Sequence, residues 1–204
     1  MTAPEPLLNT VRIDDLRPTQ MTVGFGEVSE KQKRWLEKSA SGEAAFLGRH
    51  MVPAVSGPKN RTYVIDNHHL CRALMEAGEA EVLVNIVADL SRLSKAEFWT
   101  FLDNRGWCHP YDRDGERRDF KAIPKSIGDM VDDPYRSLAG ELRRAGGFAK
   151  ETTPFSEFIW ADFLRRRVAL DLVQEHFGAA LTEALRLSKD PVAAHLPGWC
   201  GPSS

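Results

Sequence analysis

The sequence lacks a run of apolar residues long enough to cross a membrane, and its first residues lack the basic, apolar and small-residue order of a secretory signal. Cysteine is scarce: the three cysteines are odd in number and far apart, which argues against a disulfide framework and for reduced thiols. A surplus of positive charge is also missing, because 27 basic residues face 29 acidic ones and leave a formal charge of −2. A dedicated DNA-binding domain usually carries a clear basic excess. These absences predict a cytoplasmic protein without a membrane partner, and they argue against bulk binding of nucleic acid.

The composition is that of an ordinary globular protein. Of the 204 residues, 42% are hydrophobic and 27% are charged, which is enough apolar material to bury a core. The length fits one domain, or a core domain with an appendage. The sequence contains no internal repeat and no low-complexity segment.

Residues 10–90 show an alternation of strand and helix patterns. Strands are expected at residues 10–16, 52–55, 63–65 and 81–88. Helices are expected at residues 27–47 and 67–77. This arrangement predicts an α+β fold with a small mixed sheet.

Beyond Ser94 the pattern becomes mostly helical. Helices are expected at residues 95–104, from residue 132 to Gly146–Gly147, and in one or two segments of 155–187, with Pro154 in the first turn. The second half of the chain is therefore expected to be a helical extension.

The segment Asp66–Leu70 places an acid, an amide and two imidazoles where the 63–65 strand meets the 67–77 helix. Such a junction exposes backbone N–H groups at the positive end of a helix dipole, so it suits an anion. In this interpretation the N–H groups of residues 67–70 and one imidazole, that of His68, bind phosphate, and Asp66 orients a base or a magnesium ion. The adjacent imidazoles of His68 and His69 add capacity for proton transfer or metal binding, but they point about 100° apart on a helix and are not expected to face one ligand. The structural alternative is that Asp66 or Asn67 is a helix N-cap and one histidine is a buried core residue.

Several short blocks, in order along the chain, carry a family resemblance. They are Ile13–Asp14, Leu16–Gln20, Glu27–Val28, Lys31, Val52–Pro53, Ile65–Leu70, Asp89–Ser91, Phe98–Trp99, Gly106–Trp107, His109–Asp112 and Asp133–Leu138. Up to Leu70 the blocks resemble the ParB/sulfiredoxin superfamily, and the full series resembles the ParB-like putative nuclease family. The proline and acidic residues near the start predict a flexible segment at 1–9. The resemblance implies a ParB/sulfiredoxin-like core at 10–92, and the residues beyond it are expected to form a mostly helical extension at 93–204 packed on that core.

The resemblance also implies that a nucleotide binds at the turn after the central strand. Members of the superfamily include a CTP-hydrolysing partition protein, an ATP-using sulfinic acid reductase and free serine kinases. The serine kinases carry an Asp-Gly-His-His-Arg signature at this turn. The chain matches it at Asp66, His68 and His69, and departs from it at Asn67 and Leu70.

The departures bear on the chemistry. Because Leu70 replaces the arginine of the signature, Arg72 or Arg17 would have to bind the phosphate in its place. Sulfiredoxin carries its catalytic cysteine in this turn, whereas here Cys71 falls on the following helix. Sulfinic acid reduction is therefore not expected.

Upstream of the turn, Glu27 follows the Thr19–Gln20 loop at the place where the serine kinases carry a catalytic acid. The resemblance implies that Glu27 is a general base and that Thr19 and Gln20 line the nucleotide site. Alternatively, Glu27 is an acid at the start of a helix, favourable to the helix dipole. Lys31 could neutralise a phosphate or pair with Glu27 at i,i+4.

A second polar constellation lies at residues 107–112. It comprises Trp107, Cys108, His109, Tyr111 and Asp112. This loop could fold over the nucleotide turn and supply substrate contacts, or it could be an aromatic plug that joins the two halves of the chain. Its spacing matches no standard metal-ligand pattern, so Asp66 and His69 are the candidates for a metal site.

Together these features predict an enzyme that binds a nucleotide (ATP, ADP or CTP) or a phosphorylated small molecule and catalyses phosphoryl transfer or nucleotide hydrolysis. Mg²⁺ or another divalent cation would assist, and the partner would be a small-molecule substrate. The alternatives are a metal-dependent nuclease and a non-catalytic, nucleotide-gated binding module. The sequence leaves open whether the protein forms a homo-oligomer.

Overall fold

The computed structural model describes residues 8–40 and 51–202, and it divides them between two compact units. Unit 1 contains residues up to Thr22 and residues Val28–Val131, and unit 2 contains Val23–Glu27 and the residues from Asp132 onward. The predicted division into a core at 10–92 and an extension at 93–204 stays a prediction. The short strands β2 (Thr22–Val23) and β6 (Val131–Asp132) pair where the chain passes from one unit to the other.

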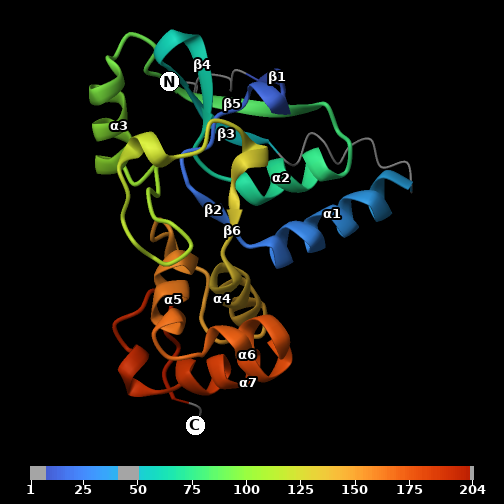
Figure 1. Ribbon diagram of the computed structural model, residues 1–204, viewed down its shortest axis with the longest axis vertical. Helices are drawn as coiled ribbons and strands as arrows, with labels where there is room; N and C mark the ends of the chain where they lie inside the picture. The colour runs from blue at the N-terminus through green and yellow to red at the C-terminus, as the bar shows by residue number, and fades with distance from the viewer. Residues whose placement is uncertain (1–7, 41–50, 203–204) are drawn as a thin grey trace, which may run out of the picture. The chain divides into compact units, whose positions relative to one another are not determined.

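Unit 1 is built on a four-stranded mixed sheet (Figure 1). Its strands are β1 (Leu8–Arg12), β3 (Val52–Gly57), β4 (Arg61–Val64) and β5 (Glu81–Asp89), in the order β1-β5-β3-β4. Strands β3 and β5 are parallel, and the other two pairings are antiparallel. The predicted α+β fold is confirmed.

Unit 1 contains the helices α2 (His68–Glu76) and α3 (Lys95–Asn104), which begin and end close to where the sequence predicts. It also contains most of α1 (Phe25–Ala40), which begins close to its predicted start. Helix α3 starts with a capping box, in which Ser94 and Glu97 bond each other's backbone N–H groups. The predicted end of the first helix at residue 47 lies outside the described residues, as does most of the segment 1–9.

The first strand is shorter than predicted. It ends at Arg12, and Ile13–Asp15 form a 3₁₀ turn in which the Leu16 N–H donates to the Ile13 carbonyl at 3.2 Å. The alternation of apolar and polar residues breaks at the adjacent Asp14 and Asp15, and the buried Ile13 and Leu16 are three positions apart. That spacing is typical of a 3₁₀ turn, in which residues i and i+3 lie on the same side.

Unit 2 is helical, with α4 (Pro134–Arg144) packed against α5 (Ser156–Arg165), α6 (Leu170–Glu175) and α7 (Phe177–Ser188). The predicted region 155–187 thus holds three helices instead of one or two. Helix α5 starts at Ser156, one residue after the left-handed Phe155 (φ 57°). Short 3₁₀ turns complete the described structure at 58–60, 120–122, 127–129 and 191–193.

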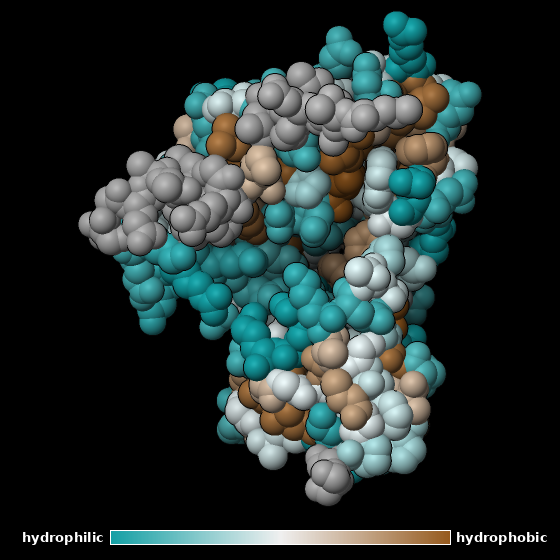
Figure 2. All heavy atoms as spheres, turned by 180° about the vertical axis from the view of Figure 1, so that it is seen from behind, coloured by the Kyte–Doolittle hydropathy of each residue, from teal (hydrophilic) through white to brown (hydrophobic). Residues whose placement is uncertain are grey.

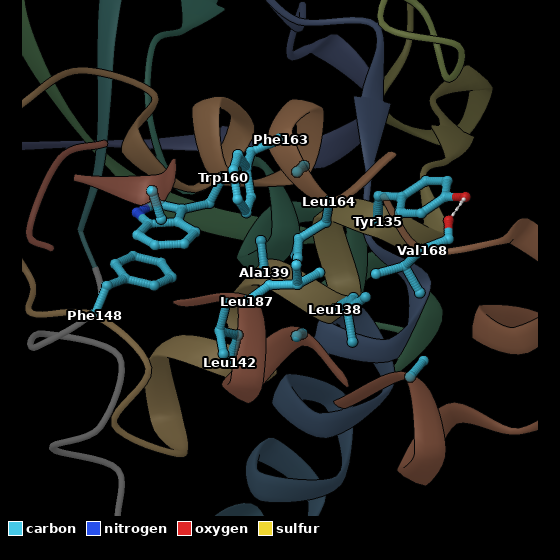
Figure 3. Packing of buried hydrophobic residues seen from close by; sticks show 14 of the residues in the cluster. Tyr135, Leu138, Ala139, Leu142, Phe148, Trp160, Phe163, Leu164, Val168 and Leu187 are labelled. Atoms are coloured by element: carbon cyan, nitrogen blue, oxygen red, sulfur yellow. Dashed lines mark hydrogen bonds between the residues drawn. The ribbon is translucent and has the colours of Figure 1, made fainter. Parts of the chain in front are cut away.

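Figure 3 shows how the apolar side chains of unit 2 interlock. The Phe148 and Trp160 rings stack with their centroids 4.5 Å apart, and the Tyr135 hydroxyl donates to the Val168 carbonyl at 2.7 Å. Leu138, fully buried, lies in the middle of this cluster. On the face seen in Figure 2, hydrophilic side chains cover most of the described surface, with smaller hydrophobic patches between them.

Among the described residues, no helix is both long enough and apolar enough to span a bilayer. This agrees with the absence of a long apolar run in the sequence.

The core of unit 2 should respond strongly to truncation of Leu138. Leu138→Ala removes buried methyl groups and leaves a cavity, so we expect a loss of about 2–5 kcal/mol in the free energy of unfolding by urea denaturation. Leu170→Ala, at a position that is 42% exposed, is the control and should change stability by about 0.5 kcal/mol or less. Equal losses in the two variants would contradict this assignment of the core.

Candidate functional site

Helix α2 follows the turn after β4, and no side chain caps its N-terminus. Asn67, at the N-cap position, instead donates from its side-chain amide to the Met51 carbonyl at 3.3 Å. The backbone N–H of Asn67 donates to Oδ1 of the exposed Asp66 at 2.7 Å. The first turn of a helix carries N–H groups that have no partner within the helix, and the dipole adds positive potential there. This end of α2 is therefore suited to an anion.

Asn67 explains how the turn can dispense with glycine. Its backbone is left-handed, with φ 64° and ψ 27°. Glycine enters this region freely, and asparagine is among the few other residues that do so often. Asn67 thus keeps the backbone path that a glycine would give. Leu70, where the kinase signature has arginine, is 6% exposed and belongs to the core.

His68 is buried and holds a neighbouring segment in place. Its Nε2 accepts a hydrogen bond from the Thr19 backbone N–H at 3.1 Å, and the Thr19 hydroxyl donates to the Val64 carbonyl at 2.8 Å. Burial lowers the pKa of His68 to about 3, although a hydrogen bond to the Val64 backbone opposes this. At neutral pH the imidazole is therefore uncharged, and its Nε2 already has a donor. This geometry favours a positioning role for His68, and its predicted contact with phosphate remains a prediction.

The 107–112 loop reaches the same segment from the other side. The His109 backbone N–H donates to the Thr19 carbonyl at 2.9 Å, and Gln20 and His109 form an isolated parallel bridge. The side-chain amide of Gln20, itself buried, donates to the Thr22 carbonyl at 2.7 Å. Through Thr19 the segment is thus bonded both to the first residue of α2 and to the 107–112 loop.

The side chains of the loop differ in what they can do. Burial is the main reason why the pKa of the Cys108 thiol rises to about 12, so the thiol stays protonated and is a poor nucleophile. Asp112 accepts from the backbone N–H groups of Asp114 and Glu116 and pairs with Arg118 at 2.5 Å, which closes a turn. Of the aromatic residues, Trp107 packs beneath Arg105.

His109 and Tyr111 form a pair within this loop. Their rings stack with centroids 4.6 Å apart and an interplanar angle of 28°, and both side chains are half-buried. His109 therefore has its backbone bonded to Thr19 and its ring against Tyr111.

The two arginines proposed as substitutes for the kinase arginine have partners of their own. Arg17 donates from Nη1 to the Lys125 carbonyl. Arg72 pairs with Glu76 at 2.6 Å. Its Nη1 also donates to three backbone carbonyls, those of Ile127, Gly128 and Met130. These bonds tie α2 to the 127–130 segment, and phosphate binding by either arginine stays a prediction, as it does for the half-buried Lys31.

Glu27 lies in unit 2, where it belongs to a buried ion-pair network. Its Oε2 is 2.7 Å from Arg136 Nη1, and its Oε1 is 3.1 Å from Arg144 Nη1. A Cβ atom added to Gly140 would lie 2.8 Å from the Glu27 carboxyl carbon, so α4 fits closely around this side chain. The role of Glu27 as a general base stays a prediction, and its observed contacts are those of a residue that fixes the start of α1.

Sequence reasoning missed Arg136, which is 6% exposed and also pairs with Glu157. It lies in the Asp133–Leu138 block that carries part of the family resemblance, but no local spacing links it to Glu27, 109 positions earlier. The sequence also proposed Asp66 and His69 as metal ligands. Within residues 8–40 and 51–202, no group of three or more His, Cys, Asp or Glu side chains could hold a metal ion.

The buried His68 should make unit 1 sensitive to acid. A histidine in the unfolded chain takes up a proton below its ordinary pKa of 6.5, whereas the pKa of folded His68 is about 3. Its contribution to stability is thus complete above pH 6.5 and is lost as the pH falls toward 3. Between about pH 7.5 and pH 5.5 we expect a loss of about 1.4 kcal/mol that is missing from His68→Gln.

The measurement is the urea dependence of hydrogen exchange in peptides from β3 and β5, which reports on unit 1. His176→Gln, at an exposed position of unit 2, should retain the pH dependence of the wild type. The same acid sensitivity in His68→Gln and in the wild type would contradict a neutral, buried His68.

The network in unit 2 should depend strongly on Glu27. Glu27→Ala leaves the buried Arg136 without one of its two carboxylates, so we expect urea denaturation to give a loss of about 3–5 kcal/mol. Glu183→Ala breaks a largely exposed pair with Arg186 and should cost about 1 kcal/mol or less. A loss in Glu27→Ala no greater than in Glu183→Ala would show that the network does not stabilise the unit.

Comparisons with known proteins identify the family of the chain and a similar solved structure. The family described as "Putative ParB-like nuclease" matches residues 9–166 of the chain. Among solved structures, the chain is similar to the crystal structure of protein Atu1540 from Agrobacterium tumefaciens, with 53% sequence identity. The match covers 98% of this chain and 100% of that one, with a TM-score of 0.92. No curated protein matches the chain. Since the family match spans well over half of the sequence, the chain belongs to the ParB-like nuclease family.

Proposed function

We propose that the protein is an enzyme that binds a nucleotide or a phosphorylated small molecule at the Asp66–Leu70 turn and catalyses phosphoryl transfer or nucleotide hydrolysis. The observation that carries this proposal is the start of α2 at the left-handed Asn67, with no side-chain cap on the helix. An anionic phosphate is the kind of ligand that such a helix end attracts. Membership of the family supports an enzymatic role in a general way.

In this proposal the backbone holds the phosphate, since the arginines nearby have other partners. The N–H groups at the start of α2 would donate to phosphate oxygens. His68 keeps Thr19 against the turn through its neutral Nε2 and thereby fixes the wall of the site.

Asp66 is the residue suited to a divalent cation. Its carboxylate is exposed at the start of the turn, and Oδ1 is oriented by the Asn67 N–H. Mg²⁺ prefers carboxylate oxygens together with phosphate oxygens, and it usually binds through only one or two protein carboxylates. Such an ion would neutralise charge on the phosphate of ATP, ADP or CTP.

The family description favours a second candidate, a metal-dependent nuclease. The same turn could hold the phosphodiester of a nucleic acid. The overall charge of −2 offers little non-specific attraction for a polyanion, which is why we place the small-molecule reaction first. A third candidate, a nucleotide-gated binding module, would bind nucleotide at the same turn without catalysing a reaction.

Thermal unfolding with ATP, ADP, CTP, Mg²⁺ and Mn²⁺ separates these functions. We expect nucleotide with Mg²⁺ to raise Tm, because a ligand that binds only the folded state stabilises it, and we expect release of inorganic phosphate. Stabilisation by metal alone together with cleavage of single- or double-stranded DNA would favour the nuclease. Stabilisation by nucleotide without release of phosphate would favour the binding module.

Asp66→Asn tests the site itself. It keeps an acceptor for the Asn67 N–H and removes the charge, so we expect an unchanged Tm without ligand and a fall in Mg²⁺-dependent turnover of about 100-fold. Asp14→Asn, at an exposed position after β1, is the matched control and should keep its turnover. Full activity in Asp66→Asn would rule out the proposed role of this carboxylate.

A further inference from the structure

The described part of unit 1 contains three histidines, and they differ in their access to solvent. His68 is 2% exposed and His69 is 7% exposed, whereas His109 is half-buried. A group that exchanges protons with a substrate must reach it directly or through one water molecule. His109 is the described imidazole of unit 1 that meets this condition best.

The backbone of His109 is fixed beside the α2 turn. Thr19 donates its N–H to His68 Nε2 at 3.1 Å and accepts the His109 N–H on its carbonyl at 2.9 Å. The first residue of α2 and His109 are therefore both bonded to the backbone of one residue. Because the bond to His109 uses the backbone, the side chain is not needed for this attachment.

The imidazole itself is oriented by an aromatic ring. The face of Tyr111 packs on it at 4.6 Å between centroids, in a nearly parallel stack. A reacting group must be held within a narrow range of positions, because a small displacement can cost much of the rate. Tyr111 can supply this restraint through the face of its ring.

The other acid–base groups named by the sequence are less suited to the task. The Cys108 thiol is buried and protonated. Asp112 is occupied by two backbone N–H groups and Arg118. Glu27 faces two guanidinium groups in unit 2.

We propose that His109 is the acid–base residue that activates the acceptor hydroxyl, and that Tyr111 positions it; this proposal rests on the function proposed above for the α2 turn. His109 accepts the proton of the acceptor, water or an alcohol, while the acceptor oxygen forms a bond to phosphorus. The bond between phosphorus and the leaving oxygen breaks, and its electron pair stays on that oxygen. The imidazolium then returns the proton to the leaving group or to solvent.

The experiment measures phosphate release from ATP, ADP and CTP with Mg²⁺ in the full-length protein. In His109→Ala we expect kcat to fall by about 100-fold or more, the usual size of a general-base contribution, with no change in the Tm shift caused by nucleotide. Added imidazole should restore part of the rate, which it would not do for a residue that serves packing alone. If His109→Ala does not fold, His109→Gln takes its place in the kinetic comparison.

Two further variants separate position from chemistry. Tyr111→Ala should lower kcat by about 10-fold with KM unchanged, because the imidazole is still present but is no longer held. His176→Ala, an exposed histidine of unit 2, is the matched control and should retain the wild-type rate.

The outcomes distinguish this inference from the proposed function. If the wild type turns over nucleotide and His109→Ala or His109→Gln stays within about twofold of it, the inference is wrong and the function stands. A loss of kcat in Glu27→Gln without a loss in the His109 variants would transfer the role to Glu27. If no nucleotide binds to the wild type or reacts, the proposed function fails and the inference fails with it.

Discussion

The two hydrogen bonds of the Thr19 backbone are the interactions on which the candidate site depends. The N–H donates toward α2, at His68, and the carbonyl accepts from the 107–112 loop, at His109. His68 and His109 are both distant from Thr19 in sequence, so each bond forms only when the fold brings that residue next to Thr19. A neutral His68 is essential, because an imidazolium would carry a proton on Nε2 and could not accept the Thr19 N–H. The uncharged imidazole of His68 thus holds Thr19 to the first residue of α2.

Unit 2 depends on a different kind of interaction. Arg136 is buried between Glu27 and Glu157, and its guanidinium lies over the Phe158 ring at 5.2 Å. Taking such a group out of water is costly unless carboxylates surround it. The network therefore requires an acidic residue at position 27, in the first turn of α1, because only a carboxylate there can pair with Arg136 and Arg144. Gly140, where an added Cβ atom would lie 2.8 Å from the Glu27 carboxyl carbon, gives the network room.

The sequence predicted the elements that have strong local signals. Helix α3 agrees with its predicted bounds because Ser94 and Glu97 form a capping box, and β5 stands out through its β-branched residues. The turn of Ile13–Asp15 was missed because the alternation of residues 10–13 was extended across Asp14 and Asp15, two adjacent acids that break it. Three helices after Phe155 were harder to separate, since short helices with shared apolar faces resemble one longer helix.

For the candidate site, local patterns identified the residues but not their partners. The polar residues of the Asp66–Leu70 turn could be found from the strand-to-helix junction alone. Which of them face solvent could not, since the burial of His68 and Leu70 depends on segments far along the chain. For the same reason the sequence could not distinguish a general base from an ion-paired residue at Glu27.

The left-handed Asn67 has a consequence for how such turns are searched for. A signature written in residue letters treats asparagine as a mismatch to glycine, although both reach the same φ and ψ. A signature written as backbone torsions, with one left-handed residue between strand and helix, would accept both. Described in that way, the Asn67 turn of this protein would match a turn in which glycine holds the left-handed position.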